Sequence, residues 1–146
     1  AEMPLRFQLL ECPMIDDRQQ TASSRLDGLP IWDRHSNEFG WRSYLGDLYG
    51  TDAVPALAAP ARASDLSGLP PAFVAVGTID GFRDEDVDYA MRLNRAGVPT
   101  ELHVYPGAPH GFQIFEQLAV TKRAARDADE WLERQLAPSS RERVRR

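Results

Sequence analysis

Two short apolar runs, each followed by a loop that carries a chemically useful side chain, constrain the fold most strongly. Ala72 to Val76 is continuously apolar, which is typical of a strand covered on both faces. Thr100 to Tyr105 alternates between apolar and polar residues, which predicts a strand near a sheet edge. Asp80 follows the first run and His110 follows the second. Because the carboxyl ends of parallel strands share one edge of a sheet, we expect these side chains to be neighbours.

The remaining patterns give the order strand, long connection, strand, helix, strand, helix. A first strand is predicted at Leu5 to Leu10, and the polar, turn-rich stretch from Asp16 to Gly40 predicts a loop with little regular structure. Apolar residues at helical spacing predict helices over Trp41 to Tyr49, Arg83 to Ala96 and Leu118 to Leu136. The order predicts an α/β fold of about three parallel strands with flanking helices. We assign residues 1–137 to this partial domain and 138–146 to a basic, disordered tail.

Each predicted helix has a face that we expect to be buried. The first places Trp41, Tyr44, Leu45 and Leu48 on one side, and the second has a stripe of Val87, Ala90 and Met91. In the last helix the corresponding residues are Ala124, Ala128, Trp131 and Leu132.

Composition excludes several classes of protein. The net charge of −5 argues against nucleic acid as a main partner, and no apolar run approaches the length needed to cross a membrane. The single Cys12 excludes an internal disulfide and fits a reducing compartment. No signal-peptide pattern opens the chain, so we expect a cytoplasmic protein.

Asp80 and His110 are the candidate catalytic residues. An exposed histidine at a strand end, beside Gly111, can exchange protons with a substrate, and an acid can orient its ring. Each residue also has a plainer interpretation, His110 as a surface-loop histidine and Asp80 as a turn or helix-cap aspartate. The chain order of acid and then histidine is that of the second half of a Ser…Asp…His hydrolase.

Other titratable residues are weaker candidates. We expect Asp84, Glu85 and Asp86 in a first helical turn, complementing the helix dipole and pointing away from the site. His103 and His35 form no recognisable metal-binding set with the acids or with Cys12, so we predict no metal site. Cys12 lacks the glycines of a nucleophile turn, which favours a small apolar packing role. No glycine-rich phosphate loop is present, and we predict no organic cofactor.

Several segments, in their order and spacing, resemble the C-terminal portion of a hormone-sensitive-lipase-like serine esterase, a group of the α/β-hydrolase family. They span most of residues 4–136. The matching segments are Cys12 to Arg18, Phe39 to Gly46, Ala59 to Ala63, Asp65 to Pro71, Asp80 to Glu85, Tyr89 with Leu93 and Ala96 to Val98, and His110 to Phe112.

The resemblance implies that Asp80 is the acid and His110 the base of a catalytic triad. It also implies that the three strands are the sixth to eighth of the hydrolase sheet, and that Trp32 and the Phe39 to Trp41 region line or support an acyl pocket. The substrate would be a small-molecule acyl ester, hydrolysed without metal or organic cofactor. The family's Gly-Asp-Ser-Ala-Gly nucleophile turn and His-Gly-Gly oxyanion loop do not occur in these 146 residues. We therefore expect the chain to be inactive alone.

Two alternatives remain. The chain could be a non-catalytic binding or assembly module that keeps a half-hydrolase fold, or a part of another α/β hydrolase such as a peptidase or lactonase. In the hydrolase sheet the Leu5 to Leu10 strand has a further neighbour, so its edge would be open here. We also expect Phe7, Leu9 and Leu10 to be uncovered, and the chain to self-associate or to pair with the missing N-terminal half.

Overall fold

The computed structural model describes residues 5–137. Its strands are β1 (Gln8–Glu11), β2 (Ala72–Ile79) and β3 (Thr100–Pro109). Its helices are α1 (Arg34–Leu45), α2 (Arg83–Arg95) and α3 (Ala119–Leu136), and four short 3-10 turns lie in the connections. The predicted basic tail at 138–146 lies outside the described residues, so its disorder stays a prediction.

The three strands form one parallel sheet in the order β1-β2-β3, which confirms the predicted α/β fold class. Leu9 lies beside Phe73, and Phe73 lies beside Glu101. All three strands therefore run in one direction, and the loops after them gather at one edge of the sheet.

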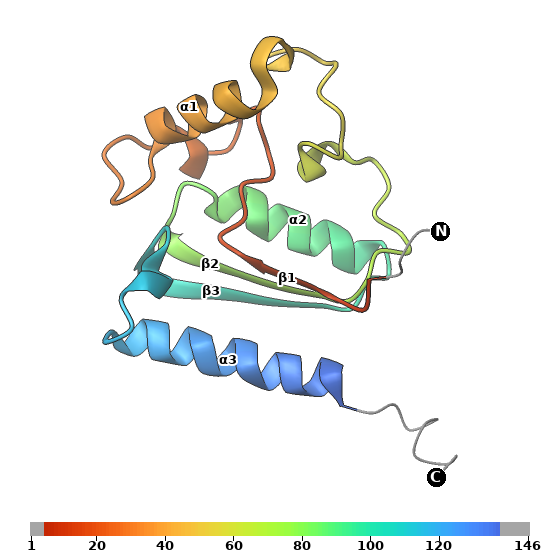
Figure 1. Cartoon of the computed structure of the whole chain (residues 1–146), viewed down its shortest axis with the longest axis vertical. Coiled ribbons are helices and arrows are strands. Elements are labelled where there is room, and N and C mark those ends of the chain that lie inside the picture. Colours follow the sequence, from red (N-terminus) through yellow and green to blue (C-terminus); the bar gives the residue numbers. More distant parts are fainter. Residues whose placement is uncertain (1–4, 138–146) are drawn as a thin grey trace.

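Helices α2 and α3 cover opposite faces of this sheet (Figure 1). On the α2 face, Ala72 and Val74 pack with Tyr89, Ala90 and Leu93 in one buried cluster. The other face carries a second cluster, which packs the alternate residues Phe73 and Ala75 against Ala124, Ala128 and Trp131 of α3. The continuous apolar run of β2 is explained by this burial on both sides.

The expectation of an irregular loop from Asp16 to Gly40 was wrong for its last part, because α1 begins at Arg34. The Asp33 carboxylate caps this helix by accepting hydrogen bonds from the backbone N–H groups of His35 and Ser36. The expected apolar face is also only half right. Trp41 and Leu45 are buried, whereas Tyr44 is exposed. Leu48 is exposed as well, because the helix ends at Leu45 and a 3-10 turn follows.

The buried face of α2 differs from the predicted stripe by part of a turn. Ala90 is buried as expected, but Met91 is 42% exposed, and Tyr89 and Leu93 fill the core instead. Two acids at the start of the helix, Glu85 and Asp86, are buried as well. A stripe chosen from apolar residues alone could not include them.

The expectation that both faces of β1 would be uncovered was wrong. Phe7 and Leu9 are half-buried against the α3 cluster, with the Phe7 ring edge-on to Trp131 at 5.5 Å between ring centroids. Leu10 packs on the α2 cluster. The outer edge of β1, in contrast, has no strand partner among residues 5–137. No helix in this described range is long and apolar enough to span a membrane.

Candidate active site

The last residues of β2 and β3 approach each other unusually closely, and this brings their loops together. A Cβ atom on Gly77 would lie 2.0 Å from the carbonyl oxygen of Ala108, so the approach requires glycine. The register of the β2–β3 pairing shifts between Gly77 and Ile79, as at a β-bulge, just before β2 ends. Asp80 and His110 follow these two strand ends directly.

The structure brings the two candidate catalytic residues into contact. Nδ1 of His110 lies 3.1 Å from Oδ2 of Asp80, which is hydrogen-bonding distance. The Asp80 side chain is completely buried, while that of His110 is 22% exposed. Oδ1 of Asp80 accepts a hydrogen bond of 2.9 Å from the Phe82 backbone N–H, which fixes the carboxylate. A buried carboxylate that holds one ring nitrogen leaves the other nitrogen of the imidazole for proton transfer.

Two aromatic rings flank His110. Phe82 meets the imidazole edge-on at 5.1 Å, and Trp32 lies tilted against it at 5.8 Å between ring centroids. Of the other residues expected near an acyl pocket, Trp41 is buried in a cluster with Leu45, and Phe39 is 73% exposed. Trp32 is therefore the one of these three that contacts the candidate catalytic pair.

Asp84 is held away from His110 by other partners. Its carboxylate accepts hydrogen bonds of 2.8 Å from the Ser23 backbone N–H and from the Arg83 side chain. Burial works against ionisation, but these hydrogen bonds lower the pKa of the Asp84 carboxyl below its ordinary value. The expectation that this acid points away from the site agrees with these contacts.

Glu85 and Asp86 lie in the first turn of α2, as expected, but they do not serve as exposed charges that complement the helix dipole. Oε1 of Glu85 accepts hydrogen bonds from the backbone N–H groups of Ile15 and Asp16, at 3.2 and 3.1 Å. Burial raises the pKa of Glu85 to about 8, and it raises the pKa of Asp86 well above its ordinary range. Burial therefore works against ionisation of both carboxyls.

Cys12 is the site neighbour that the sequence did not predict. It follows β1, is only 5% exposed, and has a left-handed backbone with φ of 47°. Its sulfur belongs to a group with Asp80 and His110 in which the three potential ligand atoms lie within 4.8 Å of one another. Burial, followed by the nearby Asp80 charge, raises the pKa of the thiol to about 12. The sequence did offer one indication of this position: Cys12 directly follows a strand, and parallel strands end at the same sheet edge.

The other histidines lie elsewhere. His103 on β3 stacks between Phe73 and Tyr105 and contacts the Glu101 carboxylate at 2.9 Å, whereas His35 is exposed near Asp27. These contacts fit the structural or surface roles expected for both.

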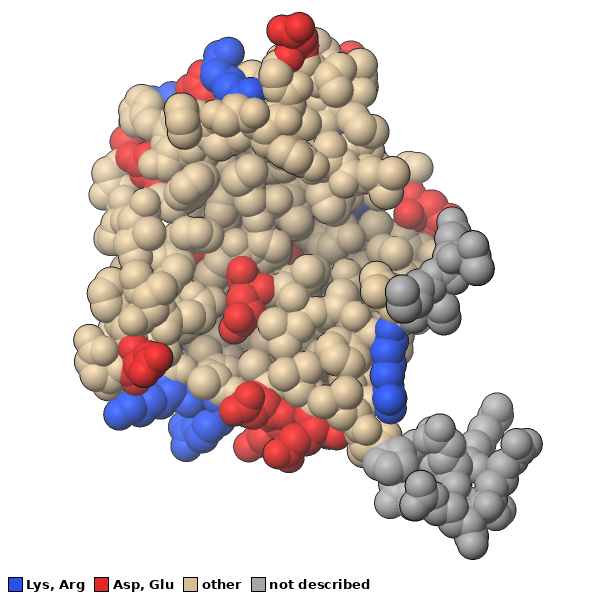
Figure 2. All heavy atoms as spheres, in the orientation of Figure 1, with Lys and Arg blue, Asp and Glu red and all other residues tan. Residues whose placement is uncertain are grey.

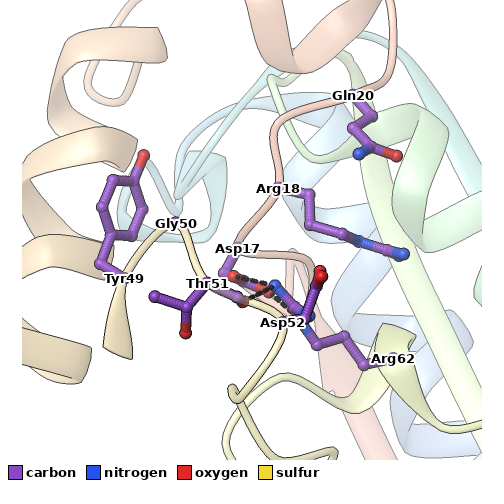
Figure 3. A pocket seen from close by; sticks show the side chains of 8 residues that line it. All are labelled: Asp17, Arg18, Gln20, Tyr49, Gly50, Thr51, Asp52 and Arg62. Atoms are coloured by element: carbon purple, nitrogen blue, oxygen red, sulfur yellow. Dashed lines mark hydrogen bonds and ion pairs between the residues drawn. The ribbon is translucent and has the colours of Figure 1, made fainter. Parts of the chain in front are cut away.

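A hollow of about 260 Å³ lies between the segment after β1 and the loop after α1 (Figure 3). Its central feature is a two-pronged ion pair between Arg62 and Asp17, at 2.7 and 2.8 Å, and Arg62 also donates to the Thr51 carbonyl. Arg18, on its wall, is paired with Asp16. The ion pair of Arg62 with Asp17 therefore ties the segment after β1 to the chain around Arg62.

The parallel sheet and the acid–histidine contact at its carboxyl edge define a portion of an α/β hydrolase. The sequence profile of the family described as having the alpha/beta hydrolase fold matches residues 1–114. The chain belongs to this family, and its strands match the C-terminal part of esterases, as the resemblance implied.

Known relatives are carboxylesterases. The chain is 39% identical over 116 residues to carboxylesterase NlhH and 36% identical over 111 residues to esterase LipI, both of Mycobacterium tuberculosis. These matches use 77% and 75% of this chain but 36% and 34% of the relatives. Among solved structures, a bacterial heroin esterase matches 94% of this chain with 40% identity and a TM-score of 0.91, over 44% of its own length. The chain thus spans about a third of the curated relatives it matches.

Proposed function

We propose that this chain supplies the acid and the base of a serine carboxylesterase, with Asp80 as acid and His110 as base. The contact of 3.1 Å between Nδ1 of His110 and Oδ2 of the buried Asp80 is the observation that carries the proposal. Kinship with carboxylesterases supports carboxylic esters as the substrate class. The attacking serine and the oxyanion donors would come from chain outside these 146 residues.

In the proposed reaction, His110 takes the proton of that serine hydroxyl through the ring nitrogen that Asp80 does not hold. The serine oxygen attacks the ester carbonyl, and His110 then gives the proton to the departing alcohol. A water molecule then attacks the acyl-enzyme by the same two proton transfers, which releases the carboxylic acid product and restores the serine. Asp80 keeps the imidazole in the required tautomer and stabilises the imidazolium that forms.

The test is a chimera in which this chain replaces the matching part of the bacterial heroin esterase, the structure it superimposes on with a TM-score of 0.91. We expect turnover of nitrophenyl esters. Asp80→Asn should lower kcat by on the order of 10⁴-fold, because the wrong histidine tautomer is favoured. The matched control is Asp84→Asn, which removes a carboxylate four residues further on and should cost far less. A crippling Asp84→Asn with a mild Asp80→Asn would refute the assignment.

The chain alone should not turn over nitrophenyl esters above a buffer control, because each missing catalytic element is worth orders of magnitude in rate. Phosphonates that label active serines should leave it unmodified. Stoichiometric labelling of any serine in the isolated chain would contradict the division of roles.

A further inference from the structure

Three side chains of different chemistry converge at the carboxyl edge of the sheet, one after each strand. Cys12 offers a sulfur, Asp80 a carboxylate oxygen and His110 a ring nitrogen, and these atoms lie within 4.8 Å of one another. The proposed esterase reaction uses the acid and the base but has no role for the thiol. Sulfur, imidazole and carboxylate are each zinc ligands, and three protein ligands with one open position are typical of zinc sites that are not purely structural.

The distances are close to those that such an ion requires. Zinc binds sulfur at about 2.3 Å and nitrogen or oxygen at about 2.0–2.2 Å, so adjacent ligands of a tetrahedral ion lie about 3.4–3.6 Å apart. The contact between His110 and Asp80 is already 3.1 Å. A side-chain adjustment of roughly 1 Å at the sulfur would complete three corners of the tetrahedron.

The surroundings favour a cation. The Phe82 N–H holds the Asp80 oxygen that His110 does not contact, as outer partners of metal ligands do. The aromatic rings of Phe82 and Trp32 restrict water around the imidazole. His110 is partly exposed, which gives an entry path. The Gln113 side-chain N–H donates to the Cys12 sulfur at 3.6 Å, as an outer partner of a metal ligand would, and a water molecule can take the fourth position.

We propose that Cys12, Asp80 and His110 bind a thiophilic divalent cation, of which Zn²⁺ is the representative, and that the bound ion blocks the acid–base pair. On binding, the S–H bond of Cys12 breaks, a metal–sulfur bond forms, and one proton passes to solvent. His110 stays neutral, with one ring nitrogen on the metal and the proton on the other, and no group is oxidised or reduced. The site departs from our sequence-based prediction of no metal.

The binding test uses the reduced 146-residue chain and Co²⁺, which gives an ultraviolet charge-transfer band when bound to a thiolate. We expect one Co²⁺ per chain, displaced by Zn²⁺. Cys12→Ser should abolish the band and weaken Zn²⁺ binding by more than the roughly 100-fold typical of losing an outer-shell partner. The matched control is His103→Asn, which removes a histidine that also contacts a carboxylate and should leave binding unchanged.

A second readout follows the thiol itself. Cys12 is the only cysteine in the sequence, so the rate of its modification by a disulfide reagent reports this site alone, and Zn²⁺ should slow it. If the chain is unfolded without metal, the same three ligands should produce the cobalt band together with a gain of secondary structure in circular dichroism. The absence of the band in either state, or undiminished binding by Cys12→Ser, would overturn the site.

The inhibitory part of the proposal rests on the proposed function and is measured separately. In the chimeric esterase, micromolar Zn²⁺ should suppress ester turnover, and Cys12→Ala should relieve the suppression. Binding without inhibition would leave the metal site standing and overturn the block of the acid–base pair. An inactive chimera would count against the esterase proposal, and the cobalt titration would then test the metal site by itself.

Discussion

Replacing Glu85 by glutamine should make the protein more stable in alkaline solution. The carboxyl is 3% exposed, and one oxygen accepts hydrogen bonds from two backbone N–H groups, which a glutamine carbonyl can also accept. The other oxygen has no partner among the described residues, so the amide NH₂ takes the place of an unbonded carboxylic O–H. The substitution therefore imitates the neutral acid and removes only its ability to ionise.

The magnitude follows from the rise in the pKa of Glu85 from its ordinary 4.5 to about 8. The folded protein binds this proton more tightly than the unfolded chain, so the contribution of Glu85 to stability falls as pH rises from 4.5 to about 8. At about 1.4 kcal/mol per tenfold change in proton affinity, the full loss above pH 8 is at most roughly 5 kcal/mol. Below pH 4.5 the two proteins should differ by no more than about 1 kcal/mol.

Urea unfolding, followed by tryptophan fluorescence from acidic to alkaline pH, measures this difference. The free energy of unfolding of Glu85→Gln minus that of the wild type should grow steadily between pH 5 and pH 8. Glu130→Gln, which removes an exposed carboxylate on α3, should show no such growth. Parallel pH profiles for Glu85→Gln and wild type would mean that Glu85 is ionised in the folded protein, and the argument from burial would fail.

Three further outcomes are expected. Gly77→Ala should destabilise the fold by roughly 3 kcal/mol and widen the spacing of Asp80 and His110, because its methyl would lie 2.0 Å from the Ala108 oxygen; an unchanged melting temperature would contradict this. Trp131→Ala should lower the free energy of unfolding by about 3–5 kcal/mol, whereas the exposed Leu57→Ala should change it by less than about 0.5 kcal/mol. Sedimentation should show self-association of the chain through the open edge of β1, and a sharply melting monomer would oppose that expectation.

Local patterns predicted the sheet and the pairing of its acid with its histidine because β2 and β3 belong to one strand–helix–strand unit. Their apolar runs, the intervening helix and the positions of Asp80 and His110 are all adjacent in sequence. The beginning of α1 was missed because few of its residues are apolar and buried, so its periodicity is weak, although Asp33 offered a capping signal.

Cys12 packs in the apolar cluster beneath α3, as predicted, but its place beside Asp80 and His110 and the burial of Glu85 were not foreseen, for a different reason. Which loops meet at a sheet edge depends on lateral strand order, and the long connection between β1 and β2 leaves that order open in the sequence. The burial of Glu85 likewise depends on the segment after β1, whose amides lie about 70 positions away along the chain. Such long-range contacts leave no trace in periodicity.

The face of the molecule in Figure 2 is largely uncharged: apart from an acidic side chain near its middle, the charged side chains lie toward its margins.

Asp80 and His110 lie only 30 positions apart and are both held by the unit from β2 to β3. Their mutual geometry is therefore set by the β2–α2–β3 unit and by the close approach of Gly77 to Ala108 within it. It does not depend on the strand that would carry a serine. We therefore expect that a hydrolase built this way can be divided genetically ahead of β1 and reassembled from two polypeptides, with the Asp80–His110 pair already formed in one of them. The dividing line gives a rational position for split-enzyme reporters, in which restored ester cleavage signals that two fused partners have met.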